Sequence, residues 1–253
     1  MLGKRTKSGV FVFDDFRDNL IIDRYDPVFA TMRGTKIEHL RSENSEDALT
    51  WNVFRSLRQI DPAFWFPGLF ARAFGCEVEQ LPQMVSVNLW PIVSPPPALH
   101  LFQKEGDSEI DILIETEYAA WLIEAKYKSD VSASTTHDPE RDQVLRNIDV
   151  GSWYAGARDF YFSLLILDEE HTPVGVSLID KYAASKDEIL ARLPHRPDRL
   201  SNLKGIGRLT WADLAAVLSD CSQLASREDE RHFAKRALEW LETKGIPTTC
   251  DCA

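Results

Sequence analysis

The chain has 253 residues, of which 44% are hydrophobic and 27% are charged, a balance typical of a globular protein that buries a sizeable core. Its net charge of −11 argues against a surface that binds polyanions all around the molecule. No apolar run is long enough for a transmembrane helix, and residues 9–13 are too short a run for a secretory signal, so we expect a cytoplasmic protein without membrane contacts.

The distribution of cysteines also favours a cytoplasmic protein. They are scattered through the sequence, at Cys76, Cys221, Cys250 and Cys252. Cys250 and Cys252 lack a second cysteine pair at the spacing of a zinc site. We therefore expect reduced thiols, as in other cytosolic proteins.

The first third of the chain contains a short predicted strand at residues 10–13 and a predicted helix at residues 46–57. Ser45 or Asn44 is a suitable N-cap for this helix. Apolar side chains recur along it at helical spacing and form one face, which consists of Leu49, Val53, Phe54 and Leu57. Residues 1–40 are expected to be an extension that precedes the main domain.

The middle of the chain is rich in predicted strands, at residues 84–89, 109–115, 121–128, 160–167 and 174–179. The prolines of residues 91–97 predict a loop. Residues 116–118 are few enough to join the second and third strands as an antiparallel hairpin. A helix that opens at Asp138, Pro139 and Glu140 follows the hairpin, and it carries Gln143, Arg146 and Asn147.

The last third of the chain is predicted to be mostly helical, with helices at residues 186–193, 210–218 and 227–241. This order of elements predicts an α/β protein, with a central mixed β-sheet and helices on both of its faces. We expect the main domain to cover residues 41–180 and the helical segment 181–253 to pack on it.

Three charged residues lie inside the apolar strands of the predicted hairpin, namely Asp111, Glu124 and Lys126. A buried charge without a partner costs several kcal/mol, so these charges require an explanation. Because side chains alternate along a strand, Glu124 and Lys126 share one face, as do Glu109 and Asp111. A cross-strand salt bridge on a solvated face is the alternative, but the apolar neighbours argue against it, namely Ile110, Ile112 and Ile114.

Two carboxylates and a lysine at one point of a sheet are suited to metal-assisted hydrolysis of a phosphodiester. Magnesium binds oxygen ligands, and one or two carboxylates suffice when substrate phosphate and water complete its coordination. Asp111 and Glu124 would supply these carboxylates. Lys126 would then hold or deprotonate the attacking water and stabilise the negative charge of the transition state.

The spacing of these residues resembles a known family. Asp111, twelve intervening residues and then Glu124-Ala125-Lys126 look like the motif of the PD-(D/E)XK nuclease superfamily, with its restriction-endonuclease-like fold. The resemblance implies an αβββαβ core in which Asp111 and Glu124 bind the metal and Lys126 acts on the water. It also implies that the carbonyl of Ala125 is a further ligand. Ile110 stands where the motif has proline, a substitution that the superfamily tolerates widely.

The resemblance extends to the flanking helices. Many members carry a glutamate on the helix before the sheet, and Glu46 has the matching position, which implies a catalytic role as a further metal ligand. Asp47 is the adjacent rival, and a glutamate in a first helical turn is also favoured by the helix dipole. Members often carry a glutamine and a basic residue on the helix after the motif, and Gln143 and Arg146 match that spacing. Gln143 is therefore a candidate catalytic residue, although an ordinary surface glutamine is the alternative.

The functional hypothesis is a nuclease that depends on Mg²⁺, for which Mn²⁺ would substitute, and that hydrolyses phosphodiester bonds in DNA. The alternative is a catalytically silent module on the same fold that binds nucleic acid or regulates another protein. Symmetric cleavage of two strands would need two active sites, which a homodimer would supply. The choice between DNA and RNA, the mode of cleavage, the sequence specificity and the biological pathway are left open by the sequence.

Two segments near the C-terminal end of the chain raise separate possibilities. Residues 192–208 are locally basic and can contact phosphates even in an acidic protein. Residues 203–208 resemble the hairpin of a helix-hairpin-helix element, whose glycines let backbone amides approach a phosphate. Trp211 stands where that element has a small residue, so we favour a turn before a helix.

Overall fold

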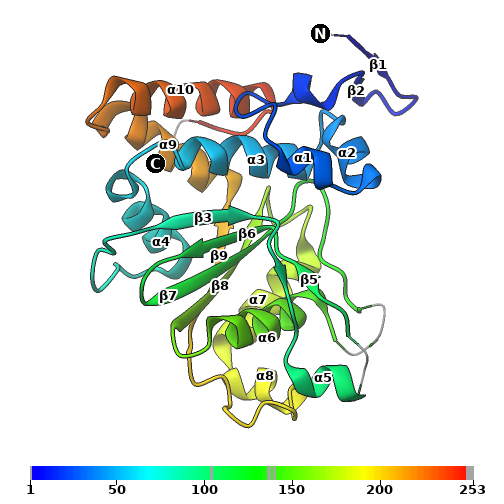
Figure 1. Ribbon diagram of the computed structural model, residues 1–253, viewed down its shortest axis with the longest axis vertical. Helices are drawn as coiled ribbons and strands as arrows, with labels where there is room; N and C mark the ends of the chain where they lie inside the picture. The colour runs from blue at the N-terminus through cyan, green and yellow to red at the C-terminus, as the bar shows by residue number, and fades with distance from the viewer. Residues whose placement is uncertain (1, 103–104, 136–137, 139–140, 249–253) are drawn as a thin grey trace. The chain divides into compact units, whose positions relative to one another are not determined.

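The computed structural model describes residues 2–102, 105–135, 138 and 141–248 (Figure 1). The chain divides into two compact units, one formed by Met1–Leu69 with Trp211–Ala253 and the other by Phe70–Thr210. These boundaries differ from the predicted divisions at residues 40 and 180, because segments from both parts of the chain combine in the first unit. Cys250 and Cys252 lie outside the described residues, whereas Cys76 and Cys221 are free thiols.

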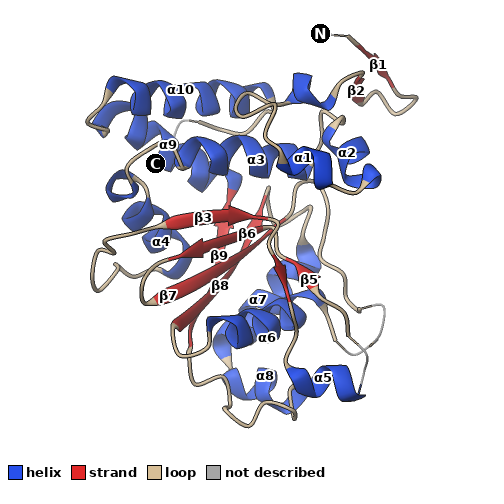
Figure 2. Ribbon diagram, viewed as in Figure 1, coloured by secondary structure: helices blue, strands red, loops and turns tan. Residues whose placement is uncertain are grey.

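The first unit is mainly helical (Figure 2). Its strands β1 (Gly3–Arg5) and β2 (Phe11–Phe13) form an antiparallel pair. Its helices are α1 (Val28–Thr31), α2 (Gly34–Leu40), α3 (Glu46–Leu57), α9 (Trp211–Leu224) and α10 (Glu228–Thr243), with 3-10 turns at Phe16–Asn19 and Pro62–Phe64. The helices predicted at residues 46–57, 210–218 and 227–241 are confirmed.

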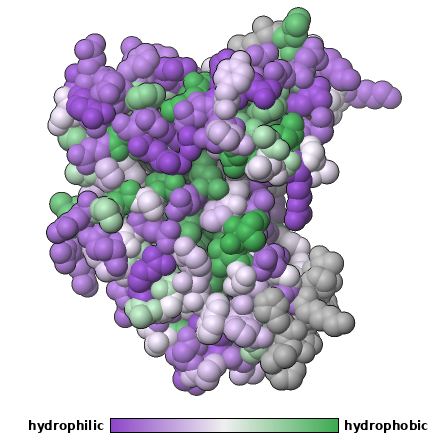
Figure 3. All heavy atoms as spheres, in the orientation of Figure 1, coloured by the Kyte–Doolittle hydropathy of each residue, from purple (hydrophilic) through white to green (hydrophobic). Residues whose placement is uncertain are grey.

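Helix α3 begins where its N-cap predicts. The Ser45 side chain accepts a hydrogen bond from the backbone N–H of Ala48, which satisfies one of the donors left open at a helix start. The predicted apolar face of α3 is fully buried, and α3 and α9 both pack against α10. Hydrophilic side chains cover the outward face of α10 (Figure 3). Amphipathic patterning therefore accounts for the packing of this unit.

The second unit is built on a five-stranded mixed sheet with the order β3-β6-β7-β8-β9. Its strands are β3 (Ser86–Leu89), β6 (Ile112–Glu115), β7 (Ala119–Ala125), β8 (Asp159–Ile166) and β9 (Leu203–Thr210). Strand β6 runs antiparallel to both of its neighbours, β3 and β7, whereas β7, β8 and β9 are parallel. The predicted α/β class and mixed sheet are therefore confirmed. Two short strands, β4 (Ile92–Val93) and β5 (Ser108–Glu109), pair separately.

Helices and aromatic side chains cover both faces of this sheet. The helices of the unit are α5 (Pro97–Phe102), α6 (Gln143–Ala155), α7 (Pro173–Ala184) and α8 (Lys186–Arg192). Helix α6 packs over β7 and β8, and α7 packs over β9. On the opposite face, the rings of Phe70 and Phe74 at the end of α4 (Phe66–Phe74) contact Trp121 and Tyr161. The sheet is thus buried on both sides, as its long apolar strands predict.

The segment 203–208 is neither a turn nor a helix-hairpin-helix element, because it lies within strand β9, which pairs in parallel with β8. Its glycines allow the strand to pack closely against helix α4. A Cβ atom on Gly207 would lie 2.0 Å from the carbonyl oxygen of Ala73 in α4, and one on Gly205 would lie 3.0 Å from the Phe74 ring. Glycine is needed here because the backbone of α4 approaches the strand closely.

Three further expectations were wrong in detail. Residues 174–179 form part of helix α7 and not a strand, since a short apolar run does not separate a buried strand from a helix. The proline-rich segment 91–97 contains β4 and the first residue of α5. Helix α6 begins at Gln143, capped by the Asp142 side chain, whereas Pro139 and Glu140 lie outside the described residues.

Candidate active site

The β6–β7 hairpin brings the two acidic positions of the motif together. Ile112 pairs with Ile123, and continuing this register by one residue sets Asp111 opposite Glu124. The Asp111 Oδ2 atom accepts a hydrogen bond of 3.0 Å from the backbone N–H of Ala125. Opposite residues of an antiparallel pair point to the same side of a sheet. The two carboxylates therefore belong to one face at the end of β7, as the sequence predicts.

Lys126 lies directly against Glu124. Its Nζ atom donates to Glu124 Oε1 at 2.5 Å and to the carbonyl oxygen of Ala125 at 2.9 Å. Glu124 is 4% exposed and Lys126 is 8% exposed. The Lys126 backbone N–H also donates to Leu165 O at 2.7 Å, which fixes this residue to strand β8. Glu124 and Lys126 thus share one face, and the ion pair between them is buried and not solvated.

Helix α6 adds two amide side chains to the same carboxylate. Gln143 Nε2 donates to Glu124 Oε1 at 2.5 Å, and Asn147 Nδ2 donates to Glu124 Oε2 at 2.6 Å. Gln143 is itself oriented, because its Oε1 atom accepts from the backbone N–H of Ser132 at 3.0 Å. Both oxygens of Glu124 are therefore held by donors, which come from helix α6 and from Lys126, the residue that follows β7.

Asn147 is the contact that sequence reasoning did not assign. It follows Gln143 by one helical turn, and residues four apart lie on the same face of a helix. It is 5% exposed, so its amide is committed to the site and not to solvent. The i, i+4 spacing from Gln143 was the signal that could have identified it.

Arg146 pairs outside this cluster. Arg146 Nε lies 3.0 Å from Glu105 Oε1, and the second oxygen of Glu105 lies 3.1 Å from Arg141 Nε. Arg146 therefore pairs with Glu105 and not with Glu124. Glu109 is exposed and belongs to strand β5, which pairs with β4.

Glu46 lies in the first turn of α3, in the first unit, whereas Asp111 and Glu124 belong to the second. Its rival Asp47 forms an ion pair of 3.2 Å with Lys36. The preference for Glu46 over Asp47 rests on the resemblance. Its role in the site stays a prediction.

The donor atoms of the cluster fit a hard divalent cation. The carboxylates of Asp111 and Glu124 and the carbonyl of Ala125 supply only oxygen, which Mg²⁺ and Mn²⁺ prefer. The Lys126 ammonium already contacts an oxygen of Glu124 and the Ala125 carbonyl, so these two oxygens face one cationic centre. Within the described residues, no cluster contains three or more His, Cys, Asp or Glu side chains placed to hold a metal. A site here therefore depends on backbone, water and substrate oxygens as well.

A second buried polar cluster lies on α6 and contains Asp149. This carboxylate accepts from Arg141 at 2.9 Å, from Arg196 at 2.7 Å and from the His195 ring at 2.7 Å. Burial would raise the pKa of Asp149, but His195 and the two arginines outweigh it and lower the pKa below its ordinary value. The network joins α6 to the segment that follows α8.

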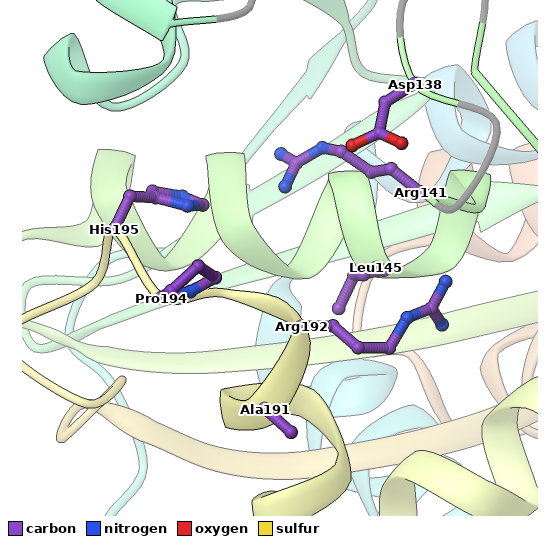
Figure 4. A pocket seen from close by; sticks show the side chains of 7 residues that line it. All are labelled: Asp138, Arg141, Leu145, Ala191, Arg192, Pro194 and His195. Atoms are coloured by element: carbon purple, nitrogen blue, oxygen red, sulfur yellow. The ribbon is translucent and has the colours of Figure 1, made fainter.

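A cavity of about 300 Å³ lies beside this network (Figure 4). Its lining consists of Asp138, Arg141, Leu145, Ala191, Arg192, Pro194 and His195. The positive charges that border it are matched, since Arg192 lies 2.8 Å from Asp142 and Arg141 pairs with Asp149 and Glu105. Much of the basic segment 192–208 is thus used for internal ion pairs, which makes it a poor surface for phosphate.

The geometry of the hairpin is the basis for any assignment of function. Comparison with protein-family models, with curated proteins and with solved structures gave no match to this chain. No helix among the described residues has both the length and the apolar character needed to cross a membrane. The resemblance to PD-(D/E)XK nucleases stays a prediction.

Proposed function

We propose that this protein is a metal-dependent nuclease that hydrolyses phosphodiester bonds, with DNA as its substrate, on a restriction-endonuclease-like core. The observation that carries the proposal is the buried Glu124 carboxylate, which contacts Lys126 and Gln143 and lies across the hairpin from Asp111. The proposal is supported by the chain order β3, β6, β7, α6, β8, in which two antiparallel strand pairings are followed by a helix and a parallel strand, as such a core requires.

The chain's own residues supply most of the arrangement that hydrolysis needs. Asp111, Glu124 and the Ala125 carbonyl would hold Mg²⁺ or Mn²⁺. When bound, such an ion lowers the pKa of water and screens the charge of a phosphoryl oxygen. Gln143 and Asn147 fix the direction of the Glu124 carboxylate, so little reorganisation is needed during the reaction.

Lys126 is placed to act on the nucleophile and on the developing charge. Its ammonium group is held within hydrogen-bond distance of Glu124 and of the Ala125 carbonyl, in a largely buried position. A buried cation interacts more strongly with a developing negative charge than a solvated one. Lys126 therefore orients the attacking water and stabilises the additional negative charge on the phosphoryl group.

The experiment that tests this proposal is incubation of the protein with linear, circular and single-stranded DNA and with RNA, each with Mg²⁺, with Mn²⁺ or with a chelator. We expect cleavage of DNA that needs the cation and stops with the chelator. Nicked or linear products from circular DNA would identify endonuclease action. Absence of cleavage of every nucleic acid, with both cations and at several pH values, would contradict the proposal.

A further inference from the structure

The hairpin formed by β1 and β2 differs from the rest of this acidic chain in its charge. Residues 2–13 contain Lys4, Arg5 and Lys7 but no aspartate or glutamate. The whole chain, in contrast, carries a net charge of −11. A local concentration of positive charge of this kind attracts polyanions even when the net charge is negative.

The hairpin is an ordered ribbon. Lys4 pairs with Val12 across the two strands, and the connecting loop is closed by a hydrogen bond of 2.8 Å from Thr6 N to Val10 O. Gly9 has a φ of +86°, the left-handed conformation that lets the loop turn. Strand β2 is tied to residues 41–43, because Phe13 N donates to Arg41 O. Strand β1 is consequently the outer strand of the ribbon (Figure 1).

The positive side chains of the ribbon are available to a ligand. Lys4, Arg5 and Lys7 are all exposed. Within the part of the chain that the structure describes, neither lysine has a carboxylate partner. Arg5 donates to Gly9 O at 2.6 Å and lies 3.8 Å from Glu43 Oε1, with 69% of its side chain exposed. An exposed ion pair at that distance contributes little and is easily exchanged.

The basic segment 192–208 shows the opposite arrangement. Arg196 is buried against Asp149 and Asp198, and Arg208 lies 2.9 Å from Glu169. Lys204 lies 3.6 Å from Asp159. Arg199 is exposed, but it too lies near a carboxylate, 3.9 Å from Asp187. The hairpin differs in that its two lysines have no carboxylate partner among the described residues.

We propose that the β1–β2 hairpin binds the phosphate backbone of the nucleic acid on which the protein acts. This inference rests on the proposed nuclease function and identifies a substrate-holding surface for it. Cationic side chains on a narrow ribbon suit a groove of duplex DNA, which admits a two-stranded β-ribbon. The contacts are to phosphates, so they raise affinity for any sequence and do not select one.

The test is the salt dependence of duplex binding, measured by fluorescence anisotropy with a chelator present so that no cleavage occurs. The variant is Lys4→Ser, Arg5→Ser, Lys7→Ser in the full chain. The slope of log K against log salt is negative, and each phosphate contact contributes about 0.9 to its magnitude, so loss of three contacts reduces that magnitude by about 2.7. The double variant Lys4→Ser, Lys7→Ser keeps Arg5 and its contact with Gly9, and it should reduce the magnitude by about 1.8.

A matched control removes the same charge elsewhere, in the variant Lys181→Ser, Lys204→Ser, Lys235→Ser, whose side chains are 47%, 47% and 71% exposed. This control should leave the slope close to that of the unaltered protein. An unchanged slope in both hairpin variants, or an equal fall in the control, overturns the inference. If the unaltered protein cleaves DNA and the hairpin variants bind as it does, the inference alone fails. If the unaltered protein neither binds nor cleaves nucleic acid, the proposed function fails with it.

Discussion

Helix α6 contributes to two buried polar clusters that differ in the partners of their carboxylates. The Glu124 carboxylate contacts one lysine, Lys126, and two uncharged amides. The Asp149 carboxylate contacts two arginines and a histidine. Both carboxylates are nearly inaccessible to solvent, with Glu124 at 4% exposure and Asp149 at 0%. Burial is thus common to the two clusters and does not separate them.

The kind of partner does separate them. Arginine holds a carboxylate with planar, directed hydrogen bonds and never loses its charge, so the Asp149 network has matched and fixed charges. Amides orient the Glu124 carboxylate without neutralising it, and the single lysine has a flexible stem and a compact charge. We therefore expect Glu124 to bind a cation more readily than Asp149. The comparison teaches that the kind of partner, and not burial alone, distinguishes the two carboxylates.

Among substitutions in the two clusters, that of Lys126 should have the largest effect. Lys126→Met keeps an unbranched apolar side chain that lacks the ammonium, so we expect cation-dependent DNA cleavage to fall by about 10²–10⁴-fold. The control is Lys181→Met, a half-exposed lysine on α7, which should cleave at the unaltered rate. Initial rates under single-turnover conditions measure both. Equal rates for Lys126→Met and the control would remove Lys126 from the site.

Substitution of Asp149 should act on stability and not on chemistry. Asp149→Asn leaves Arg141 and Arg196 buried without their full negative partner, so we expect the free energy of unfolding to fall by about 3–5 kcal/mol. Urea unfolding followed by circular dichroism measures this loss. Asp180→Asn on the exposed side of α7 is the control and should have no effect. An Asp149→Asn protein that unfolds like the control would show that the second cluster is not structural.

Substitution of Asn147 should have a smaller effect, confined to activity. Asn147→Ala removes the donor to Glu124 Oε2 but leaves Gln143 and Lys126 on Oε1, so we expect a fall in the cleavage rate of about tenfold. Asn147→Asp should lower the rate further, because a like charge then faces Glu124. Rates measured over a range of Mg²⁺ concentrations should also show that both variants need more Mg²⁺ than the unaltered protein to reach their maximal rate. A rate unchanged in both variants would contradict a positioning role for Asn147.

The smallest expected effect is a dependence of stability on acid pH. The folded pKa of Asp149 is lowered, so its interactions contribute fully above the unfolded value of about 3.9 and are lost as pH falls through the lower folded pKa. The unaltered protein should therefore lose stability below about pH 4, and Asp149→Asn should lose less over that range. Thermal unfolding at a series of pH values between 3 and 6 measures the difference. Parallel curves for the two proteins would contradict this assignment.

The sequence was most informative where structure is determined locally. The start of α3 follows from the Ser45 cap and from the helical spacing of Leu49 and Val53, which involve only neighbouring residues. The meeting of Asp111 and Glu124 follows from alternation and a short turn. These features are therefore predictable without knowledge of the rest of the chain.

The sequence was least informative where distant segments meet. Strand β9 contains glycines that argue against a strand, and their reason is the approach of Ala73 in α4, far away in the sequence. Asp149 looks like a surface residue of an amphipathic helix until Arg196 reaches it from 47 positions away. The spacing of Arg146 matched that of a site residue, but its side chain forms an ion pair with Glu105. Tertiary partners of this kind are not readable from local pattern.

The most direct test of the proposed site is the cation-dependent cleavage rate of Asp111→Asn. Asn can still accept the hydrogen bond of Ala125 N through its side-chain oxygen, so the change removes charge and keeps the contact. We expect DNA cleavage to be lost, stabilisation by Mg²⁺ or Mn²⁺ to be lost with it, and thermal stability in chelator to stay that of the unaltered protein. Cleavage by Asp111→Asn at the unaltered rate, with the same cation requirement, would contradict the assignment of Asp111 and Glu124 as the site of phosphodiester hydrolysis.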